Sequence, residues 1–169
     1  MCLSQKIERV FSPRAKPLQV IADRVLQLDS DVEEALWFSG RDWHKVTWQE
    51  WQQHDCAIYF FNPEAFAYYL PSVLSLSLQN PNESLNAADS LINWLDRSPN
   101  VDGWTEDFAS RFLEMNRAEL DVLKEWLLRI CDYAPYRTYG AAASGPGDTF
   151  GRAFDTVDLL QKEVERRRS

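Results

Sequence analysis

Helix-start signals recur along the whole chain and restrict it, more than any other feature, to a mainly α-helical fold. In a capping box, a Ser, Thr or Asn is followed three residues later by Glu. Each side chain then bonds a backbone N–H of the other residue. This spacing occurs at Ser30 with Glu33, at Thr47 with Glu50 and at Asn116 with Glu119. Asn62-Pro63-Glu64 is a fourth start, because Asn caps well, Pro suits the first helical position and Glu favours the positive end of the helix dipole.

Apolar residues at helical spacing follow these starts and extend them into helices. The sequence predicts a single-domain bundle of about seven helices over residues 1–169. Its longer helices are expected over 18–28, 31–39, 62–79, 84–95, 116–131 and 150–168.

One apolar run is too short to assign by periodicity. Cys56–Phe61 (CAIYFF) fits a buried strand and also the lead-in to a helix. The expectation for this run is therefore either a short strand pair near residues 56–60 or a helix entry.

Residues 134–149 (APYRTYGAAASGPGDT) are the clearest loop in the sequence. They contain three Gly, two Pro and the small-residue run Ala141–Ser144. A loop of this length inside a compact domain is usually functional or mobile. The terminal helix is expected to follow it directly, over residues 150–168.

Charge is spread unevenly over the chain. The net charge is −8, from 18 Lys and Arg against 26 Asp and Glu. Residues 1–16 form a basic N-terminal segment with net +3 and residues 162–169 carry +2, so residues 17–161 carry −13. An acidic body repels phosphate backbones, which argues against direct binding of nucleic acid.

The sequence also indicates a compartment. No window is apolar enough for a membrane span, and no secretory signal is visible at the N-terminus. The three cysteines are odd in number and widely spaced, which is typical of reduced thiols. We expect a cytoplasmic protein without membrane contact.

Residue types that carry catalysis or bind metals are few. Cys56 or Cys131 could act as a nucleophile with His44 or His54, but Cys131 falls on an apolar helix face and Cys56 in an apolar run, where thiols are inert. His54-Asp55-Cys56 offers three metal-ligand types, although adjacent residues rarely converge on one ion. We therefore expect no catalytic residue, no metal site and no cofactor.

Acidic residues gather at two expected helix starts, and an aromatic residue accompanies the second group. Negative charge is favoured at a helix N-terminus, which is the structural explanation of both groups. The functional explanation is a contact surface for a basic protein, in which Trp supplies binding energy. Trp43 and Trp104 are the tryptophans expected at the surface, because both lie in predicted loops beside acidic residues. The candidate contact residues are Asp29, Asp31, Glu33, Glu34, Asp102, Trp104, Glu106 and Asp107.

Residues 61–71 (FNPEAFAYYLP) carry a family resemblance. They resemble the F-x-x-P-E-A-F-x-Y-Y-L-P signature of a family of small, uncharacterised bacterial proteins, and the helix around Trp126-Leu127 is similar to a later helix of that family. The resemblance extends over about residues 60–130. It implies a bacterial protein and no established activity.

The chain is also similar in type to bacterial toxin immunity proteins, which are small, acidic, rich in Trp and free of catalytic motifs. We expect a non-enzymatic binding protein that neutralises a cognate basic toxin, such as a nuclease, by covering its active cleft. Two alternatives stay open. One is a small-molecule-binding or regulatory domain with an aromatic pocket of Tyr68, Tyr69 and Trp94, and the other is an enzyme that uses His54 or Cys56.

Overall fold

The computed structural model describes residues 1–22, 30–137 and 149–169, without the side chains of Ser30 and Asp31. Within these residues the chain forms nine α-helices and no strand, so the predicted mainly α fold is confirmed. The helices are α1 (Leu3–Phe11), α2 (Ser30–Trp37), α3 (Trp48–Gln53), α4 (Ala57–Phe60), α5 (Pro63–Gln79), α6 (Asn86–Leu95), α7 (Glu106–Phe112), α8 (Arg117–Ile130) and α10 (Thr149–Arg168). None of these helices is long and apolar enough to cross a bilayer.

The predicted number of about seven helices is too low, and the strand pair near residues 56–60 is wrong. Ala57–Phe60 within this run forms the single-turn helix α4, with Cys56 and Phe61 as its caps, and Ala57 and Ile58 are buried. The carboxylate of Glu34, on α2, accepts a hydrogen bond from the Cys56 backbone N–H at 3.0 Å. A six-residue apolar run carries no usable period, and this stabilising contact comes from a distant part of the chain.

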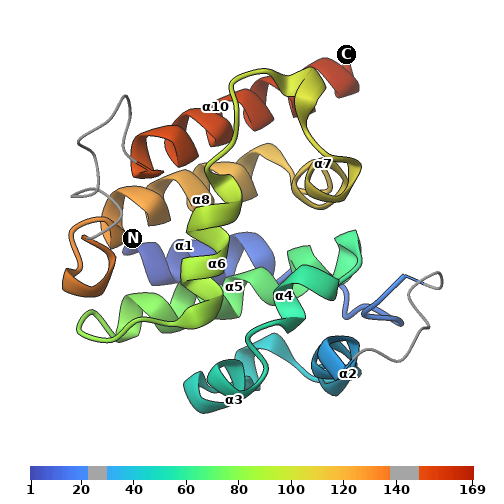
Figure 1. Cartoon of the computed structure of the whole chain (residues 1–169), viewed down its shortest axis with the longest axis vertical. Helices are drawn as coiled ribbons and strands as arrows, with labels where there is room; N and C mark the ends of the chain where they lie inside the picture. Colours follow the sequence, from blue (N-terminus) through green and yellow to red (C-terminus); the bar gives the residue numbers. More distant parts are fainter. Residues whose placement is uncertain (23–29, 138–148) are drawn as a thin grey trace.

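Helix α5 is the centre of the fold. Residues Ala65–Leu74 are buried one after another, as expected for a helix that is apolar around its whole circumference. Helices α1, α6, α7 and α8 pack against it. Helix α10 lies on α8 and α6 at one end of the long axis, and α2 and α3 form the other end (Figure 1).

The helix starts read from the sequence are confirmed where the structure describes their side chains. Thr47 Oγ1 accepts from the Glu50 N–H at 3.3 Å, and the Glu50 carboxylate accepts from the Thr47 N–H at 2.8 Å. At α5, Asn62 Oδ1 accepts from the Ala65 N–H at 2.8 Å. These contacts span three residues, which is why the sequence alone reveals them.

The helix expected over residues 18–28 is wrong for the part that is described. Residues 17–22 are not helical, and Leu18 is fully exposed. The Val20 carbonyl accepts from the Asn62 N–H at 2.8 Å, and the Gln19 carbonyl accepts from Asn62 Nδ2 at 2.9 Å. The segment therefore bonds to the start of α5 instead of to itself. Residues 23–28 of this prediction lie outside the described residues.

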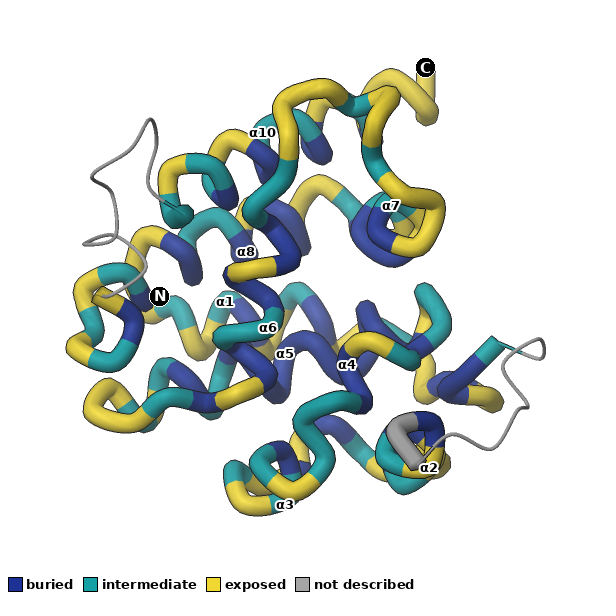
Figure 2. The backbone as a smooth tube through the Cα atoms, in the orientation of Figure 1, coloured by how far each residue is buried: buried dark blue, intermediate teal, exposed yellow. Residues whose placement is uncertain are grey.

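Aromatic rings fill much of the core and meet in two groups. One group, near α2, α3 and α5, is linked by contacts among Phe38, Trp51, Phe61 and Tyr69. The other, between α5, α6 and α7, is linked by contacts among Phe66, Trp94, Phe108 and Phe112. Buried backbone runs through the middle of the molecule in Figure 2. The surface position expected for Trp43 is wrong, since its side chain is 5% exposed.

Both basic ends are engaged within the protein. Lys6 Nζ lies 2.6 Å from a Glu125 carboxylate oxygen, and Arg14 makes a two-pronged contact with Glu119 at 2.5 and 2.6 Å. These pairs attach the N-terminal segment to α8, and at the other end Arg166 and Arg167 contact Glu163.

Only part of the loop predicted over residues 134–149 is described. Ala134–Tyr136 forms a 3₁₀ turn, and residues 138–148 lie outside the described residues. Helix α10 begins at Thr149, one residue before the predicted start. The buried Tyr136 hydroxyl accepts from the Leu85 N–H at 2.9 Å, so the beginning of this segment is attached to the start of α6.

Candidate functional site

Three of the predicted contact residues lie together at the start of α7. Asp102 is in the 3₁₀ turn Val101–Gly103, and Glu106 and Asp107 are in the first turn of the helix. All three side chains are exposed. Thr105 caps the helix by accepting from the Phe108 N–H at 3.3 Å. We call Asp102, Trp104, Glu106 and Asp107 the α7 acidic surface.

Trp104 is the aromatic member of the α7 acidic surface, and it is partly buried. Its indole N–H donates to the Ser98 carbonyl at 2.9 Å, and its ring meets Phe108 edge-on at 5.2 Å between centroids. The ring is thus fixed in place while one part of it faces solvent. A rigid, half-exposed Trp beside carboxylates fits the expected contact role and also a role in closing the core.

Asp107 has a structural partner as well. Its carboxylate pairs with the guanidinium of Arg111, which is 6% exposed. Arg111 also donates to the Phe61 carbonyl at 2.8 Å and to the Tyr59 carbonyl at 2.9 Å. This network joins α7 to the end of α4, so Asp107 contributes to packing in addition to surface charge.

The C-terminus lies near the α7 acidic surface (Figure 1). The pKa of Arg166 is raised, chiefly by its hydrogen bond to Glu163 and, to a smaller extent, by the charge of Asp102. Among the described residues, neither Asp102 nor Glu106 has a basic nitrogen within 4.0 Å of its carboxylate. The negative charge of these two residues is therefore available to a partner.

The other predicted group, at α2, is less uniform. Asp29 lies outside the described residues, as does the side chain of Asp31. Glu33 is exposed, but Glu34 is half-buried and its carboxylate caps the start of α4. Helix α2 lies at one end of the long axis and α7 in the other half, so the two groups do not form one surface (Figure 1).

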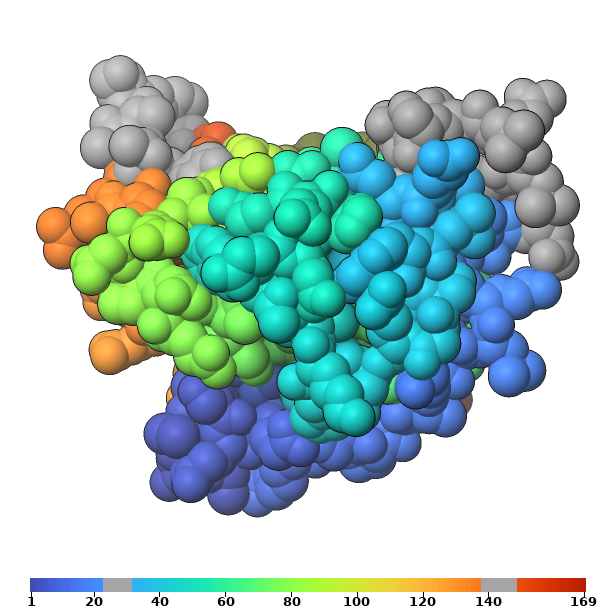
Figure 3. Space-filling view, turned by 90° about the horizontal axis from the view of Figure 1, so that it is seen from below, coloured from blue at the N-terminus to red at the C-terminus, as the bar shows by residue number. Residues whose placement is uncertain are grey.

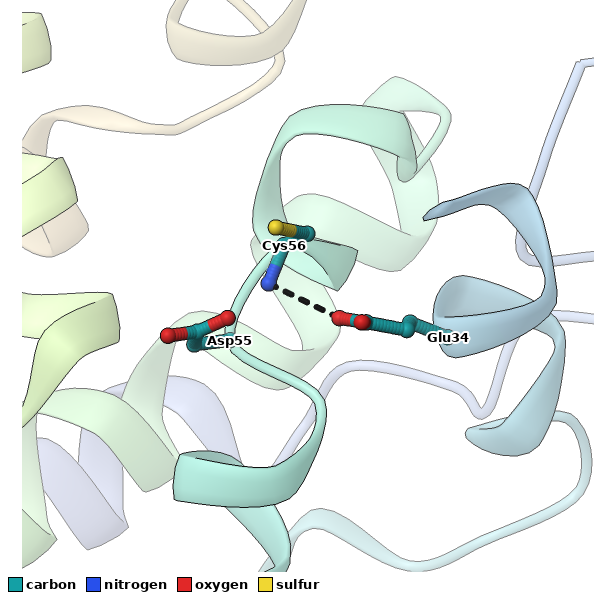
Figure 4. Close-up of side chains that lie close together, drawn as sticks. All are labelled: Glu34, Asp55 and Cys56. Atoms are coloured by element: carbon teal, nitrogen blue, oxygen red, sulfur yellow. Dashed lines mark hydrogen bonds between the residues drawn. The ribbon is translucent and has the colours of Figure 1, made fainter. Parts of the chain in front are cut away.

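Glu34, Asp55 and Cys56 form a cluster of possible metal ligands, each offering one atom within 4.8 Å of the others (Figure 4). The protein already uses both carboxylates, because Glu34 accepts from the Cys56 N–H and Asp55 accepts from Asn86 Nδ2 at 2.7 Å. The cluster joins α2, α4 and α6. His54 takes no part in it, and no sequence signal links Glu34 to residues 55 and 56.

His54 instead belongs to a stack of three side chains. Its ring lies 4.5 Å from the Trp37 ring at an interplanar angle of 21°. The Arg41 guanidinium lies over the Trp37 ring at 3.5 Å. Trp37 is therefore sandwiched between two basic side chains at the edge of the first aromatic group. This packing accounts for the position of the His54 ring without a catalytic or metal-binding role.

His44 is held by two carboxylates from different parts of the chain. Its Nδ1 lies 2.7 Å from Asp42 Oδ1, and its Nε2 lies 3.0 Å from Glu8 Oε1 on α1. The ring also stacks on Trp43 at 3.7 Å. A ring with both nitrogens beside carboxylates donates a hydrogen bond to each of them when it is protonated, so this arrangement favours the protonated ring.

These contacts shift the pKa of all three groups. Burial lowers the pKa of His44, but the hydrogen bonds to Asp42 and Glu8 outweigh it and raise the pKa above its ordinary 6.5. The pKa of Glu8 is lowered chiefly by its hydrogen bond from Ser12, and that of Asp42 chiefly by its bond from His44. Lys16 adds a smaller attraction to Asp42.

The contribution of His44 to stability is expected to depend on pH. A raised histidine pKa stabilises the fold below about pH 6.5, and this stabilisation is lost as the pH rises through the folded-state pKa. The lowered pKa values of Glu8 and Asp42 act in the opposite sense, with stabilisation above their ordinary values of 4.5 and 3.8. His44→Gln should therefore cost more at pH 5.5 than at pH 8.5, though under about 1 kcal/mol because solvent screens the pair.

Urea denaturation of wild type and His44→Gln at the two pH values measures this difference. Glu8→Gln should reduce the pH dependence of the His44→Gln effect, because it removes one of the two carboxylates. An equal cost of His44→Gln at both pH values would show that the protonated ring is not what stabilises the contact.

The three residues expected to line an aromatic pocket are packed into the core. Tyr68, Tyr69 and Trp94 are at most 7% exposed. Tyr69 donates its hydroxyl to the Phe38 carbonyl at 2.5 Å, and burial raises its pKa. Trp94 belongs to the second aromatic group instead of lying beside the two tyrosines. Its described ring contacts are with Tyr59, Phe66, Phe108 and Phe112.

Comparison with known proteins gives one match. The model of a family of unknown function, DUF6714, matches residues 3–129, which reach from α1 almost to the end of α8. No curated protein and no solved structure matches the chain.

Proposed function

The chain belongs to this family of unknown function, and since that membership names no activity, we propose from its surface chemistry that it is a non-enzymatic binding protein. The proposed partner is a basic protein, most concretely a toxin whose active cleft the α7 acidic surface covers. The observation that carries the proposal is that Asp102 and Glu106 are exposed beside a fixed, half-exposed Trp104 and have no ion pair with a described residue. Such a surface combines electrostatic steering with an aromatic anchor.

The arrangement of the polar residues supports binding over catalysis. Both His44 nitrogens bind carboxylates, the His54 ring stacks on Trp37, and the carboxylates beside Cys56 accept hydrogen bonds from the protein. Each group that the sequence offered for chemistry has a structural partner. In the α7 acidic surface, by contrast, Asp102 and Glu106 have no ion pair with a described residue. Charge on the exterior of a protein affects its partners and association rates more than its fold.

Charge reversal tests this proposal. The variant Asp102→Lys/Glu106→Lys should slow association with the toxin about tenfold or more, because steering by opposite charges is lost. Glu83→Lys/Asp155→Lys is the matched control, since it changes the net charge equally at exposed acids away from α7. Binding is measured at low and high salt, and growth is measured in cells that co-express the protein with the product of a neighbouring gene that is toxic alone.

The two variants must differ for the proposal to stand. Wild type and the control variant should restore growth, and the α7 variant should not. Equal protection by both variants would place the contact elsewhere on the protein. Absence of any neighbouring product that binds, with its toxicity unchanged by wild type, would reject the toxin as the partner.

A further inference from the structure

A small hollow beside the turn between α2 and α3 is bordered by three cationic side chains. Its volume is about 270 Å³, and Lys16, Arg41 and Lys45 line it together with Asp42 and Glu50. Figure 3 shows the N-terminal residues, in dark blue, beside the lighter blue and cyan surface of the following segments. In an acidic protein, such a gathering of positive charge is a local exception that has to be explained.

None of the three cations forms a direct ion pair with a described residue, and Asp42 attracts Lys16 only from beyond ion-pair distance. Among the described residues, no carboxylate oxygen lies within 4.0 Å of their side-chain nitrogens. Lys16 Nζ donates to the Gly40 carbonyl at 2.9 Å, and Arg41 Nε donates to the Trp37 carbonyl at 2.8 Å. Both contacts are to neutral acceptors, so the positive charges keep their capacity to bind an anion.

The two carboxylates at the hollow are occupied by donors from the protein. Asp42 Oδ1 accepts from the His44 N–H at 3.0 Å and from the His44 ring at 2.7 Å. Glu50 Oε2 accepts from the Thr47 N–H at 2.8 Å and from its hydroxyl at 3.0 Å. The carboxylates therefore hold the local turn and helix cap, and with three cations against two carboxylates the lining side chains keep a net charge of +1.

The turn also holds two of the three cations, Lys16 and Arg41, in place before a ligand arrives. The Arg41 guanidinium lies over the Trp37 ring at 3.5 Å, and its described hydrogen bond, from Nε to the Trp37 carbonyl, leaves its two terminal nitrogens for a ligand. Gly40 adopts a φ of +72°, a conformation that favours glycine, and this turn directs its carbonyl toward Lys16. Positioned donors lose less entropy on binding than mobile ones.

We propose that this hollow binds a small oxyanion, namely a phosphate or carboxylate group of a small molecule. Guanidinium and ammonium groups bind both kinds of oxyanion with charge-assisted hydrogen bonds. The volume is below the usual range for drug-sized ligands, which favours a compact anion over a nucleotide. The site is separate from the α7 acidic surface, so this proposal does not depend on the proposed function.

The test is a titration followed by amide and indole NMR shifts of the full chain. Sodium phosphate and sodium succinate are the two probes, and sodium chloride at matched ionic strength is the control. At least one oxyanion should cause saturable shifts at residues 40–50 and at the Trp37 indole, and comparison of the two distinguishes a phosphate site from a carboxylate site. Lys45→Gln should weaken binding about tenfold, the usual loss for one charged hydrogen bond.

A matched variant makes the result decisive. Lys45 makes no side-chain hydrogen bond or ion pair with a described residue, so its replacement should leave the fold intact. Lys162→Gln removes an exposed lysine of α10 and should leave the affinity unchanged. Shifts no larger than those with chloride, or equal weakening by Lys45→Gln and Lys162→Gln, would overturn the proposal.

Discussion

Replacing Glu119 with alanine should destabilise the protein by about 4 kcal/mol, because it breaks a buried ion pair and a helix cap together. The Glu119 side chain is 1% exposed, and its carboxylate accepts from Arg14 at 2.5 and 2.6 Å. It also accepts from the Asn116 N–H at 2.7 Å at the start of α8. Without it, the 18% exposed Arg14 side chain keeps its charge and loses its best partner.

Urea denaturation at neutral pH measures this effect as a lower midpoint with an unchanged slope. Glu125→Ala is the matched control, because Glu125 lies on the same helix and pairs with Lys6 in a solvent-exposed contact. That substitution should cost less than about 1 kcal/mol. If the two substitutions cost the same, burial does not decide the strength of the contact between α1 and α8.

Replacing Arg111 with methionine should destabilise the protein by about 3 kcal/mol. The methionine keeps most of the apolar stem but leaves the carbonyls of Phe61 and Tyr59 without their donors. An unsatisfied buried polar group costs about 1–3 kcal/mol. The loss is expected because α7 and the end of α4 are joined through this one guanidinium, which is 6% exposed.

Two further variants separate the roles of this network. Arg111→Lys should be intermediate, since one ammonium group cannot reproduce the forked contact with both carbonyls. Asp107→Asn should cost less than about 1 kcal/mol, because the Asp107 side chain is 59% exposed and its pairing with Arg111 faces solvent. A methionine variant as stable as wild type would mean that the two carbonyls find other donors.

Local signals in the sequence predicted much of the fold. Thr47 with Glu50, Asn116 with Glu119 and Asn62 before Pro63 mark the starts of α3, α8 and α5, and each makes the capping contact that its spacing predicts. These contacts depend on residues three apart, so they can be read without knowing the tertiary structure.

Contacts between residues far apart in the sequence explain what the predictions got wrong or missed. The acidic neighbour of Trp43 and its predicted loop position favour the surface, but its side chain is 5% exposed and its ring stacks on His44. Glu34 and Asp107, two of the predicted contact residues, also have structural partners within the protein, since Glu34 caps the start of α4 and Asp107 pairs with a buried arginine. The cations of the hollow were missed for the same reason, since Lys16 is close to Lys45 only in the folded chain. Residue type and spacing cannot reveal such pairs.

The attachment of α1 to α8 has a consequence for the order of events during synthesis. Lys6 and Glu125 are separated by 119 residues, and Arg14 and Glu119 by 105. At 5–20 residues per second, the ribosome delivers the partner of Lys6 about 6–24 s after Lys6 itself. Until then α1 has α5 to lie against but not the helix that neutralises its charges. Helix α1 is thus made well before the helix that secures it, and closure over so many residues belongs to the slow, non-local class of folding steps.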